Sequence, residues 1–301
     1  MKSISIHLTD VCNNSCKFCV VGSNQETKEH VNLKVLKGFI KESQLEGYKK
    51  VNIHGGEPTE SEVLLEILDY ICECGFEEVT MQTNARKLSD KNFARELVAR
   101  KVNLFVVSLH GVDAEMHEWA TTVQGSFDEA IQGIKNVLSL GASVRTNTVI
   151  CKKNFNRLSE IVKFISKLGV QHINISNMHP TGKAYINFNE VVVKLSDIMP
   201  YLEEAIHVLD STDIVCTIEG FPLCVLTDYE KKHLIDWDEN QFKLLYHKTL
   251  IPNYDDFMQQ STKKHGEVCK KCEMRKVCGG VYKEYLQFFG WDEFEHGVLN
   301  G

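Results

Sequence analysis

Three cysteines near the N-terminus are close enough in sequence to bind metal together. Cys12, Cys16 and Cys19 have the spacing C-x3-C-x2-C, and an aromatic residue, Phe18, directly precedes the last thiol. A cubane [4Fe–4S] cluster normally takes four Cys ligands, so three thiolates would leave one iron open. A catalytic metal site keeps such an open position. The alternatives are a zinc loop or unligated core cysteines, but zinc sites usually show paired C-x2-C knuckles, and this segment does not.

A second group of cysteines lies near the C-terminus. Cys269, Cys272 and Cys278 have the spacing C-x2-C-x5-C, and Cys224 stands alone before them. Four thiolates can ligate a complete cubane cluster or close a structural zinc site. The spacing alone leaves both alternatives open.

The elements that must position these residues are predicted from hydrophobic periodicity. Residues 3–8 alternate like a half-buried strand. Further strands are predicted at 51–54, 78–83, 104–109, 143–150 and 172–176, and helices at 33–45, 62–72, 90–99, 127–140 and 155–168. Strands alternating with helices predict an α/β fold with a parallel sheet. Six units are too few for a closed eight-stranded barrel, so we expect a partial (β/α)6 TIM-type barrel, whose functional residues follow the carboxyl ends of the strands.

The pattern changes after about residue 182. A long helix is predicted at 191–209 and a strand at 214–218, and a less regular segment that contains the C-terminal cysteines follows. We therefore predict two domains, a barrel at 1–185 and a small C-terminal domain at 186–301.

Composition limits the classes of function. The chain has 301 residues, of which 43% are hydrophobic, and a net charge of −7 without a Lys/Arg-rich block. A nucleic-acid partner is therefore not expected. The first predicted strand starts within three residues of Met1, which leaves no room for a signal peptide, and no apolar run is long enough to span a membrane. Eleven cysteines without a secretion signal favour metal binding in a reducing compartment, so we expect the cytoplasm.

Two motifs together resemble a known family. The cysteine triplet with Phe18 resembles the cluster motif of the radical SAM superfamily. The second predicted strand ends in Gly55-Gly56-Glu57-Pro58, which resembles that family's loop for the amino group of S-adenosylmethionine (SAM). Two glycines let backbone carbonyls approach a ligand closely, and Glu57 offers an acceptor for an ammonium group.

The resemblance extends to later strand ends. Thr83 and Asn84 end the third strand and Ser108 ends the fourth. In the family, polar groups at these positions contact the ribose and methionine parts of SAM, and Ser108 is the expected ribose contact. Arg145 resembles the residue that pairs with the SAM carboxylate, a role suited to a planar bidentate donor. The alternative for Arg145 is a surface or barrel salt bridge. Residues 180–182 resemble the turn beside the adenine.

The C-terminal cysteines resemble the auxiliary-cluster extension called SPASM or twitch. A full SPASM extension carries cysteines for two clusters, and this chain lacks some of them. The resemblance therefore implies one auxiliary [4Fe–4S] cluster held by Cys224, Cys269, Cys272 and Cys278. If Cys224 is free, that cluster has an open iron.

Membership of this family implies a reaction. SAM bound at the open iron is cleaved by one electron to methionine and a 5′-deoxyadenosyl radical, which removes a hydrogen atom from the substrate. An external reductant, a flavodoxin or ferredoxin, is implied. Cys151, directly after the fifth strand, could return a hydrogen atom to a substrate radical, as in radical SAM epimerases; the alternative is an ordinary loop cysteine.

Three functions stay open at this point. The first is the modification of a ribosomally made peptide or a protein side chain, which many relatives with auxiliary clusters carry out. The second is the dehydrogenation or epimerisation of a small molecule such as an amino sugar. The third is a non-catalytic zinc-binding interaction protein.

Overall fold

One large curved sheet organises the chain. The computed structural model describes residues 2–22, 32–235 and 242–295. The strand order is β7-β6-β5-β4-β3-β2-β1-β8-β9, and all neighbours are parallel except β9, which is antiparallel to β8. The strands are β1 (Ser3–His7), β2 (Lys50–His54), β3 (Glu78–Thr83), β4 (Val102–Ser108), β5 (Ser143–Val149), β6 (His172–Ser176), β7 (Val215–Glu219), β8 (Phe242–Tyr246) and β9 (Thr249–Ile251).

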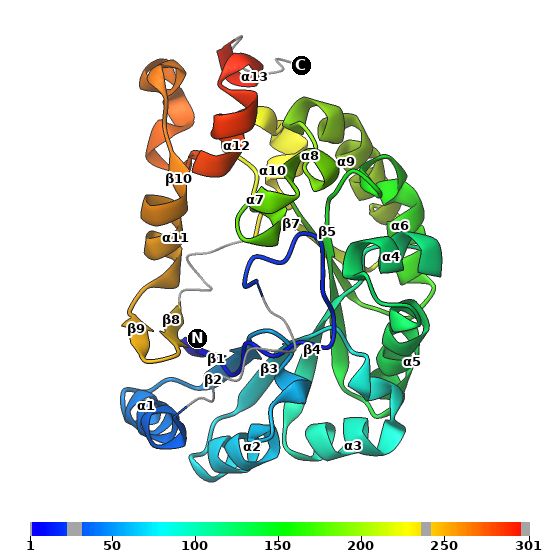
Figure 1. Cartoon of the computed structure of the whole chain (residues 1–301), viewed down its shortest axis with the longest axis vertical. Helices are drawn as coiled ribbons and strands as arrows, with labels where there is room; N and C mark the ends of the chain where they lie inside the picture. Colours follow the sequence, from blue (N-terminus) through cyan, green and yellow to red (C-terminus); the bar gives the residue numbers. More distant parts are fainter. Residues whose placement is uncertain (1, 23–31, 236–241, 296–301) are drawn as a thin grey trace.

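The sheet forms a partial barrel. Within the described residues its edges are β7 and β9, which do not pair with each other, so the predicted α/β, TIM-type partial barrel is confirmed. In Figure 1 helices cover the convex side, while the loop after β1 crosses the concave side. These helices are α1 (Leu33–Leu45), α2 (Leu64–Glu73), α3 (Lys91–Ala99), α4 (Ala114–Thr121), α5 (Ser126–Ser139), α6 (Leu158–Ser166) and α9 (Leu195–Leu209).

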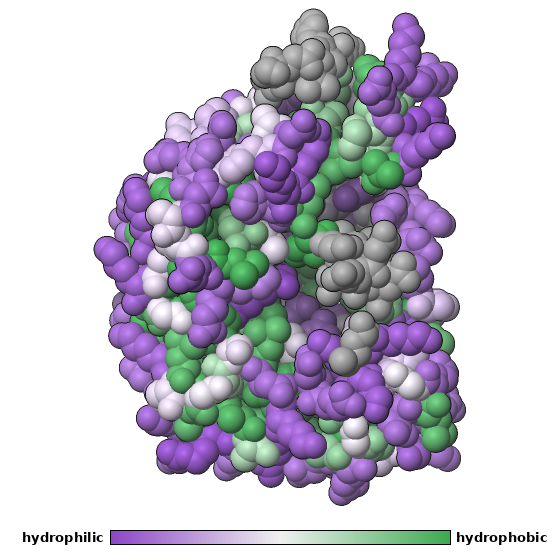
Figure 2. All heavy atoms as spheres, turned by 180° about the vertical axis from the view of Figure 1, so that it is seen from behind, coloured by the Kyte–Doolittle hydropathy of each residue, from purple (hydrophilic) through white to green (hydrophobic). Residues whose placement is uncertain are grey.

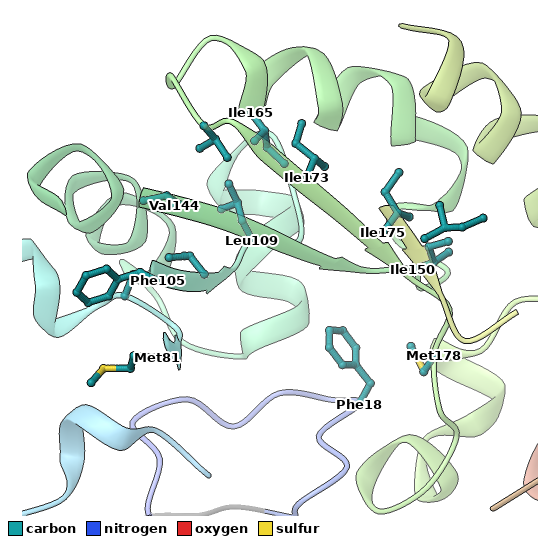
Figure 3. Packing of buried hydrophobic residues seen from close by; sticks show 14 of the residues in the cluster. Phe18, Met81, Phe105, Leu109, Val144, Ile150, Ile165, Ile173, Ile175 and Met178 are labelled. Carbon is teal, nitrogen blue, oxygen red and sulfur yellow. The ribbon is translucent and has the colours of Figure 1, made fainter. Parts of the chain in front are cut away.

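The hydrophobic core lies between the strands and these helices. Successive side chains of a strand point to opposite faces of the sheet. Val144, Ile173 and Ile175 pack with Ile165 of α6, as Figure 3 shows, and all four are buried. The alternate positions of the same strands carry polar side chains on the concave side. That side is where the functional residues gather.

Residues after 185 complete the sheet at both ends. β7, the strand predicted at 214–218, pairs with β6, and β8 pairs with β1, so within the described residues eight strands run parallel, two more than the six predicted for the barrel. The division into two domains at residue 185 stays a prediction. The remaining helices and strands are α7 (Lys183–Ile186), α8 (Phe188–Val191), α10 (Asp228–Lys231), α11 (Tyr254–Thr262), α12 (Lys283–Phe289), α13 (Asp292–Glu295), and the antiparallel pair β10 (Lys263–Lys264) and β11 (Val281–Tyr282). Short 3-10 helices span Pro58–Glu60, Lys87–Ser89, Phe155–Arg157, Leu223–Val225, Glu267–Lys271 and Glu273–Lys276.

The start of one helix was misplaced and one strand was missed in the sequence analysis. The helix predicted at 191–209 begins at Leu195, because the backbone is extended at Val192 and Lys194. β8 was not predicted because its buried run contains Lys243. That charge is tolerated since its ammonium lies 2.6 Å from a carboxylate oxygen of Glu46, at the end of α1.

The outer surface is mostly hydrophilic in the view of Figure 2, with hydrophobic side chains distributed between polar ones. Across the described part of the chain, no helix has the length and apolarity needed to span a membrane.

Candidate active site

The loop that carries the three N-terminal cysteines is fastened at both ends. Backbone N–H groups of Ser15 and Lys17 donate to carbonyls at the end of α4, at 3.1 and 2.9 Å. The N–H of Lys183, at the start of α7, donates to the carbonyl of Cys19 at 2.9 Å. Phe18 reaches into the core (Figure 3), and its ring meets that of His110 edge-on at 5.1 Å. Hydrogen bonds to α4 and α7 thus hold the backbone of the loop that carries the three thiols.

Two of the thiols of this loop, those of Cys12 and Cys16, lie in a desolvated environment. Burial raises the pKa of the Cys12 thiol to about 11, and the nearby Cys19 adds to the effect. Burial likewise raises the pKa of Cys16 to about 12, with contributions from Cys19 and Cys12. Three neighbouring thiolates therefore need a positive charge, which a bound metal group supplies.

The separation of the sulfurs argues against a single zinc ion. Four thiolates around one tetrahedral zinc lie about 3.8 Å apart, since the Zn–S bond is about 2.3 Å. Of the residues the structure describes, these cysteines do not form a group whose ligand atoms all lie within 4.8 Å of one another. The three sulfurs would have to move closer together to bind one zinc ion, and thiolates are also the usual ligands of iron–sulfur clusters, so the donor set fits a cluster.

The glycine loop after β2 packs directly against the chain leading to the cysteines. The N–H of Gly56 donates to the Thr9 carbonyl at 2.6 Å, and that of Glu57 to the Val11 carbonyl at 2.8 Å. A Cβ on Gly56 would lie 2.4 Å from the Val11 oxygen, and one on Gly55, whose φ is +150°, would lie 2.4 Å from the Thr9 oxygen. The glycines are therefore required by this close approach of two backbone segments, whatever ligand they also meet.

Glu57 is at the centre of a buried hydrogen-bond network and is 1% exposed. Its Oε1 accepts from the backbone and hydroxyl of Thr59, at 3.1 and 2.7 Å, and from the hydroxyl of Thr83 at 2.7 Å. Its Oε2 accepts from the N–H of Asn84 at 2.7 Å. Burial raises the pKa of the carboxyl, while these donors act in the opposite direction. Oε2 keeps a lone pair for a further donor such as an ammonium group.

Asn84 connects this network to the cysteine loop. Its amide donates to Oδ1 of Asn13 at 2.6 Å and lies 3.9 Å from the sulfur of Cys12. The N–H of Asn14 also lies 3.4 Å from that sulfur. Hydrogen bonds to a ligating sulfur orient it and tune the bound group. The predicted contacts of Thr83 and Asn84 with SAM stay predictions; in the structure Thr83 donates to Glu57, and Asn84 connects Glu57 to the cysteine loop.

Arg86 is a residue of the site that sequence analysis missed. Its guanidinium donates to the carbonyl of Asn13 and, at 3.2 Å, to Oδ1 of Asn14. It also pairs with Glu129 on α5. The sequence does show an arginine two residues after Asn84. Nothing in the neighbouring residues indicated that its side chain contacts the cysteine loop.

Ser108 and Arg145 lie on the concave side of the sheet. Ser108 ends β4 opposite Asn147 of β5, and Arg145 lies two residues earlier on the same strand. The Nε of Arg145 is buried and has no hydrogen-bond partner in the described part of the chain. Burial lowers the pKa of this guanidinium, and Glu219 acts in the opposite direction. A buried N–H without a partner is costly, so this guanidinium is suited to receive a carboxylate.

The comparisons with known proteins decide the family. Residues 6–180, more than half of the chain, match the model of the radical SAM superfamily. The chain belongs to this superfamily. It is a radical SAM enzyme, and members of the superfamily use a [4Fe–4S] cluster and SAM. Membership of an enzyme family argues against the alternative of a non-catalytic zinc-binding protein.

Proteins similar to this radical SAM enzyme differ in what they act on or bind, according to their names. It is 31% identical over 206 residues to a "Probable GTP 3',8-cyclase" of Sulfurisphaera tokodaii, which covers 68% of the chain and 64% of the relative. The chain thus spans less than two thirds of that relative's length. Streptococcus suis SuiB bound to its precursor peptide SuiA has a similar fold, with a TM-score of 0.70, 18% identity, and coverage of 95% of this chain and 72% of SuiB. The structure of anSMEcpe with bound AdoMet has a TM-score of 0.60, 17% identity, and coverage of 94% and 90%.

Cys151 lies in the hydrophobic core of this radical SAM enzyme. Its side chain is 1% exposed and its N–H donates to Oδ1 of Asn154 at 2.8 Å. Burial raises the pKa of its thiol to about 11. The role of this thiol as a donor of a hydrogen atom to a substrate radical stays a prediction. It requires that the substrate radical reach this buried sulfur.

The four C-terminal cysteines line one cavity of about 590 Å³. Backbone N–H groups of Leu223 and Gly280 point at the sulfur of Cys278, at 3.5 and 3.4 Å. Burial raises the pKa of Cys224 to about 12, and the other three thiols of the cavity add to this effect. Lys271 and Arg275 line the same cavity and favour thiolates there. The structure thus brings together Cys224, Cys269, Cys272 and Cys278 around one cavity, and their role as ligands of an auxiliary cluster stays a prediction.

Proposed function

We propose that this radical SAM enzyme modifies a side chain of a ribosomally synthesised peptide or a protein. The observation that carries the proposal is the extent of the fold likeness to SuiB, which includes 95% of the chain and therefore most of the C-terminal cysteine region. SuiB binds the precursor peptide SuiA, and anSMEcpe was solved with the Kp18Cys peptide. The match to the cyclase covers 68% of the chain.

Three thiolates, from Cys12, Cys16 and Cys19, would hold the cluster that binds SAM. Held there, the cluster and SAM would together supply the removal of a hydrogen atom from an unactivated carbon of the substrate, at the expense of one electron from an external reductant. Glu57 would accept the ammonium group of SAM, and Arg145 would pair with its carboxylate through two N–H groups. Gly55, Gly56 and Pro58 would shape the ammonium loop, and Thr83, Asn84 and Ser108 would contact the methionine and ribose parts.

The C-terminal cavity would hold one auxiliary [4Fe–4S] cluster of the twitch or SPASM type. Four thiols fully ligate a cubane. Within the described residues, no three of these cysteines have sulfurs that all lie within 4.8 Å of one another, so a single zinc ion would require these sulfurs to move closer together. Two N–H groups at the sulfur of Cys278 are suited to a thiolate bound to a cluster. A flavodoxin or ferredoxin in the cytoplasm would supply the electron.

A small-molecule substrate is the second candidate. The relatives that are 31% identical are named as cyclases of GTP, which is a small molecule. The concave side of the sheet also carries a polar network: Glu219 accepts from Asn174 and Ser176, at 2.9 and 2.5 Å. Such groups can hydrogen-bond to the hydroxyl or amino groups of a small polar substrate.

An anaerobic assay separates these candidates. The reconstituted enzyme is incubated with SAM, dithionite and, in parallel, GTP or a peptide encoded beside its gene, and 5′-deoxyadenosine and the product mass are measured. We expect a mass change of the peptide and about eight irons per chain, because two cubanes are bound. A product from GTP with an unchanged peptide would replace the first candidate by the second. Zinc in place of iron at the C-terminal cavity would contradict the auxiliary cluster.

A further inference from the structure

A group of metal-ligating side chains lies beside the cysteine loop and was not singled out from the sequence. His7 is the last residue of β1, and Asp10 lies three residues later in the chain. His247 lies in the turn between β8 and β9. Nε2 of His7 is 2.6 Å from Oδ1 of Asp10, and Nε2 of His247 is 3.3 Å from Oδ2 of the same carboxylate. The three ligand atoms all lie within 4.8 Å of one another.

The sheet brings these residues together from distant parts of the sequence. β1 pairs in parallel with β8 so that His7 lies opposite Tyr246, and His247 is the next residue. His247 has a φ of 54° in the two-residue turn between Tyr246 and Thr249. A left-handed conformation is uncommon for residues other than glycine, although histidine is among those that adopt it more often. The turn thus keeps an imidazole beside Asp10 at some conformational cost.

The separations are close to those of a metal coordination shell. Nitrogen and oxygen ligands of tetrahedral zinc, at about 2.0 to 2.2 Å from the ion, lie about 3.3 Å apart. Here Nε2 of His247 is 3.3 Å from Oδ2 of Asp10, whereas Nε2 of His7 is 2.6 Å from Oδ1, so an ion would require the His7–Asp10 pair to separate by less than about 1 Å. Two imidazoles and one carboxylate suit zinc, iron(II) or manganese(II). We propose that His7, Asp10 and His247 bind one divalent transition-metal ion, separate from both iron–sulfur clusters.

The position of this ion indicates what it would bind. Three protein ligands leave a coordination position for water or substrate. His7 points to the concave side of the sheet, since Ile6 and Leu8 on either side of it are in the core. Its ring lies 5.4 Å from that of His54, which directly precedes Gly55 of the SAM loop. The ion would therefore take oxygen donors of the substrate, such as a carboxylate, phosphate or hydroxyl group, next to the SAM loop.

The alternative is that Asp10 simply accepts hydrogen bonds from two imidazoles. Manganese(II) titration of the anaerobic holoenzyme, with its clusters oxidised, distinguishes the two. Free manganese is measured by its electron paramagnetic resonance at room temperature, and zinc(II) is then added as a competitor. We expect one manganese(II) bound per chain and displaced by one equivalent of zinc(II). The variants His247→Asn and Asp10→Asn should each weaken binding at least about tenfold, since even outer-shell changes have effects of this size.

His247→Asn is the more informative variant, because asparagine tolerates the left-handed turn and removes only the imidazole. Iron content is measured for every variant, so that damage to the cysteine loop is detected separately. His207→Ala is the matched control: this exposed imidazole lies 3.0 Å from the carboxylate of Asp210 but is not in a three-ligand group. The control should bind manganese(II) like the wild type. The proposal is overturned if the wild type binds none at millimolar manganese(II), or if His247→Asn with full iron content binds it equally tightly.

Discussion

The backbone N–H of Asn84 donates to the carboxylate of Glu57 at 2.7 Å, which fastens the loop after β2 to the end of β3. The side-chain amide of the same asparagine lies 3.9 Å from the sulfur of Cys12. The loop of Gly55 to Pro58, proposed to bind SAM, and the loop of Cys12 to Cys19, proposed to hold the cluster, are therefore parts of one hydrogen-bonded unit. A change in either loop is expected to affect both cofactors.

The first prediction concerns Glu57→Gln. The amide retains one acceptor oxygen but places an NH₂ group where a carboxylate oxygen now accepts, so a buried donor loses its partner. We expect the free energy of unfolding to fall by about 1 to 3 kcal/mol. Urea unfolding of the anaerobic, cluster-free protein measures it. Glu60→Gln is the control, since its partly exposed pair with Lys87, at 3.1 Å, should contribute less than about 1 kcal/mol. Equal losses in both variants would contradict the central role of Glu57.

The second prediction concerns the three N-terminal thiols. Cys12→Ala, Cys16→Ala and Cys19→Ala should each abolish the formation of 5′-deoxyadenosine, because the cluster would lose one of only three protein ligands. The measurement is chromatography of the anaerobic reaction with dithionite. Cys72→Ala should keep full activity, because this thiol belongs to a different part of the fold. It lies 3.3 Å from the carbonyl of Arg100, where the C-terminal ends of α2 and α3 meet. Undiminished SAM cleavage by any of the three variants would remove that residue from the ligand set.

The third prediction concerns Arg145→Lys. Lysine keeps the charge but loses the planar pair of donors, so the Michaelis constant or dissociation constant for SAM should rise about 10- to 100-fold. Equilibrium binding of SAM to the reconstituted enzyme measures this. Arg157→Lys, in a surface pair with Glu160 at 2.7 Å, should leave the affinity unchanged. If Arg145→Lys binds SAM normally, the carboxylate partner lies elsewhere and Arg145 has the alternative role of a barrel ion pair, with Glu219 as its nearest candidate.

The parts of the fold and site that could be predicted are those encoded locally. The strands β1 to β6 follow from alternation within short segments, and the cysteine loop follows from its spacing. β8 was missed because Lys243 interrupts its apolar pattern, and the compensating Glu46 is 197 residues away in the sequence. The group formed by His7, Asp10 and His247 was missed for the same reason, since it exists only once β8 pairs with β1.

The glycines after β2 illustrate a different limit. Their sequence resembles a ligand-binding loop, and that resemblance led to the family. The structure adds a reason that does not involve a ligand, namely the packing of Gly55 and Gly56 on the carbonyls of Thr9 and Val11. Contacts between two loops cannot be read from either loop alone.

The fourth prediction concerns the C-terminal cavity. Cys278→Ala leaves three thiols at the cavity, so it should lower the iron content by between about one and four irons per chain and stop product formation, while some 5′-deoxyadenosine is still formed. The reason is that the auxiliary cluster and the SAM cluster have separate ligands. Iron analysis and the product assay are made on the same reconstituted sample. Cys216→Ala serves as the control, because this buried thiol of β7 does not line the cavity. Normal product from Cys278→Ala would show that the cavity has no part in the reaction.

The fifth prediction concerns Gly56→Ala. Its Cβ would lie 2.4 Å from the Val11 carbonyl oxygen, so the backbone of one loop must move. We expect the free energy of unfolding to fall by about 1 to 3 kcal/mol, as for other overpacked sites. Because the displaced segment leads into the cysteine loop, reconstituted iron content should fall as well. Gly38→Ala, within α1 and with nothing within 4 Å of its Cβ, should instead stabilise the protein by up to about 1 kcal/mol. Unchanged iron content in a destabilised Gly56→Ala protein would mean that the cysteine loop is positioned independently of the SAM loop, contrary to the network through Asn84.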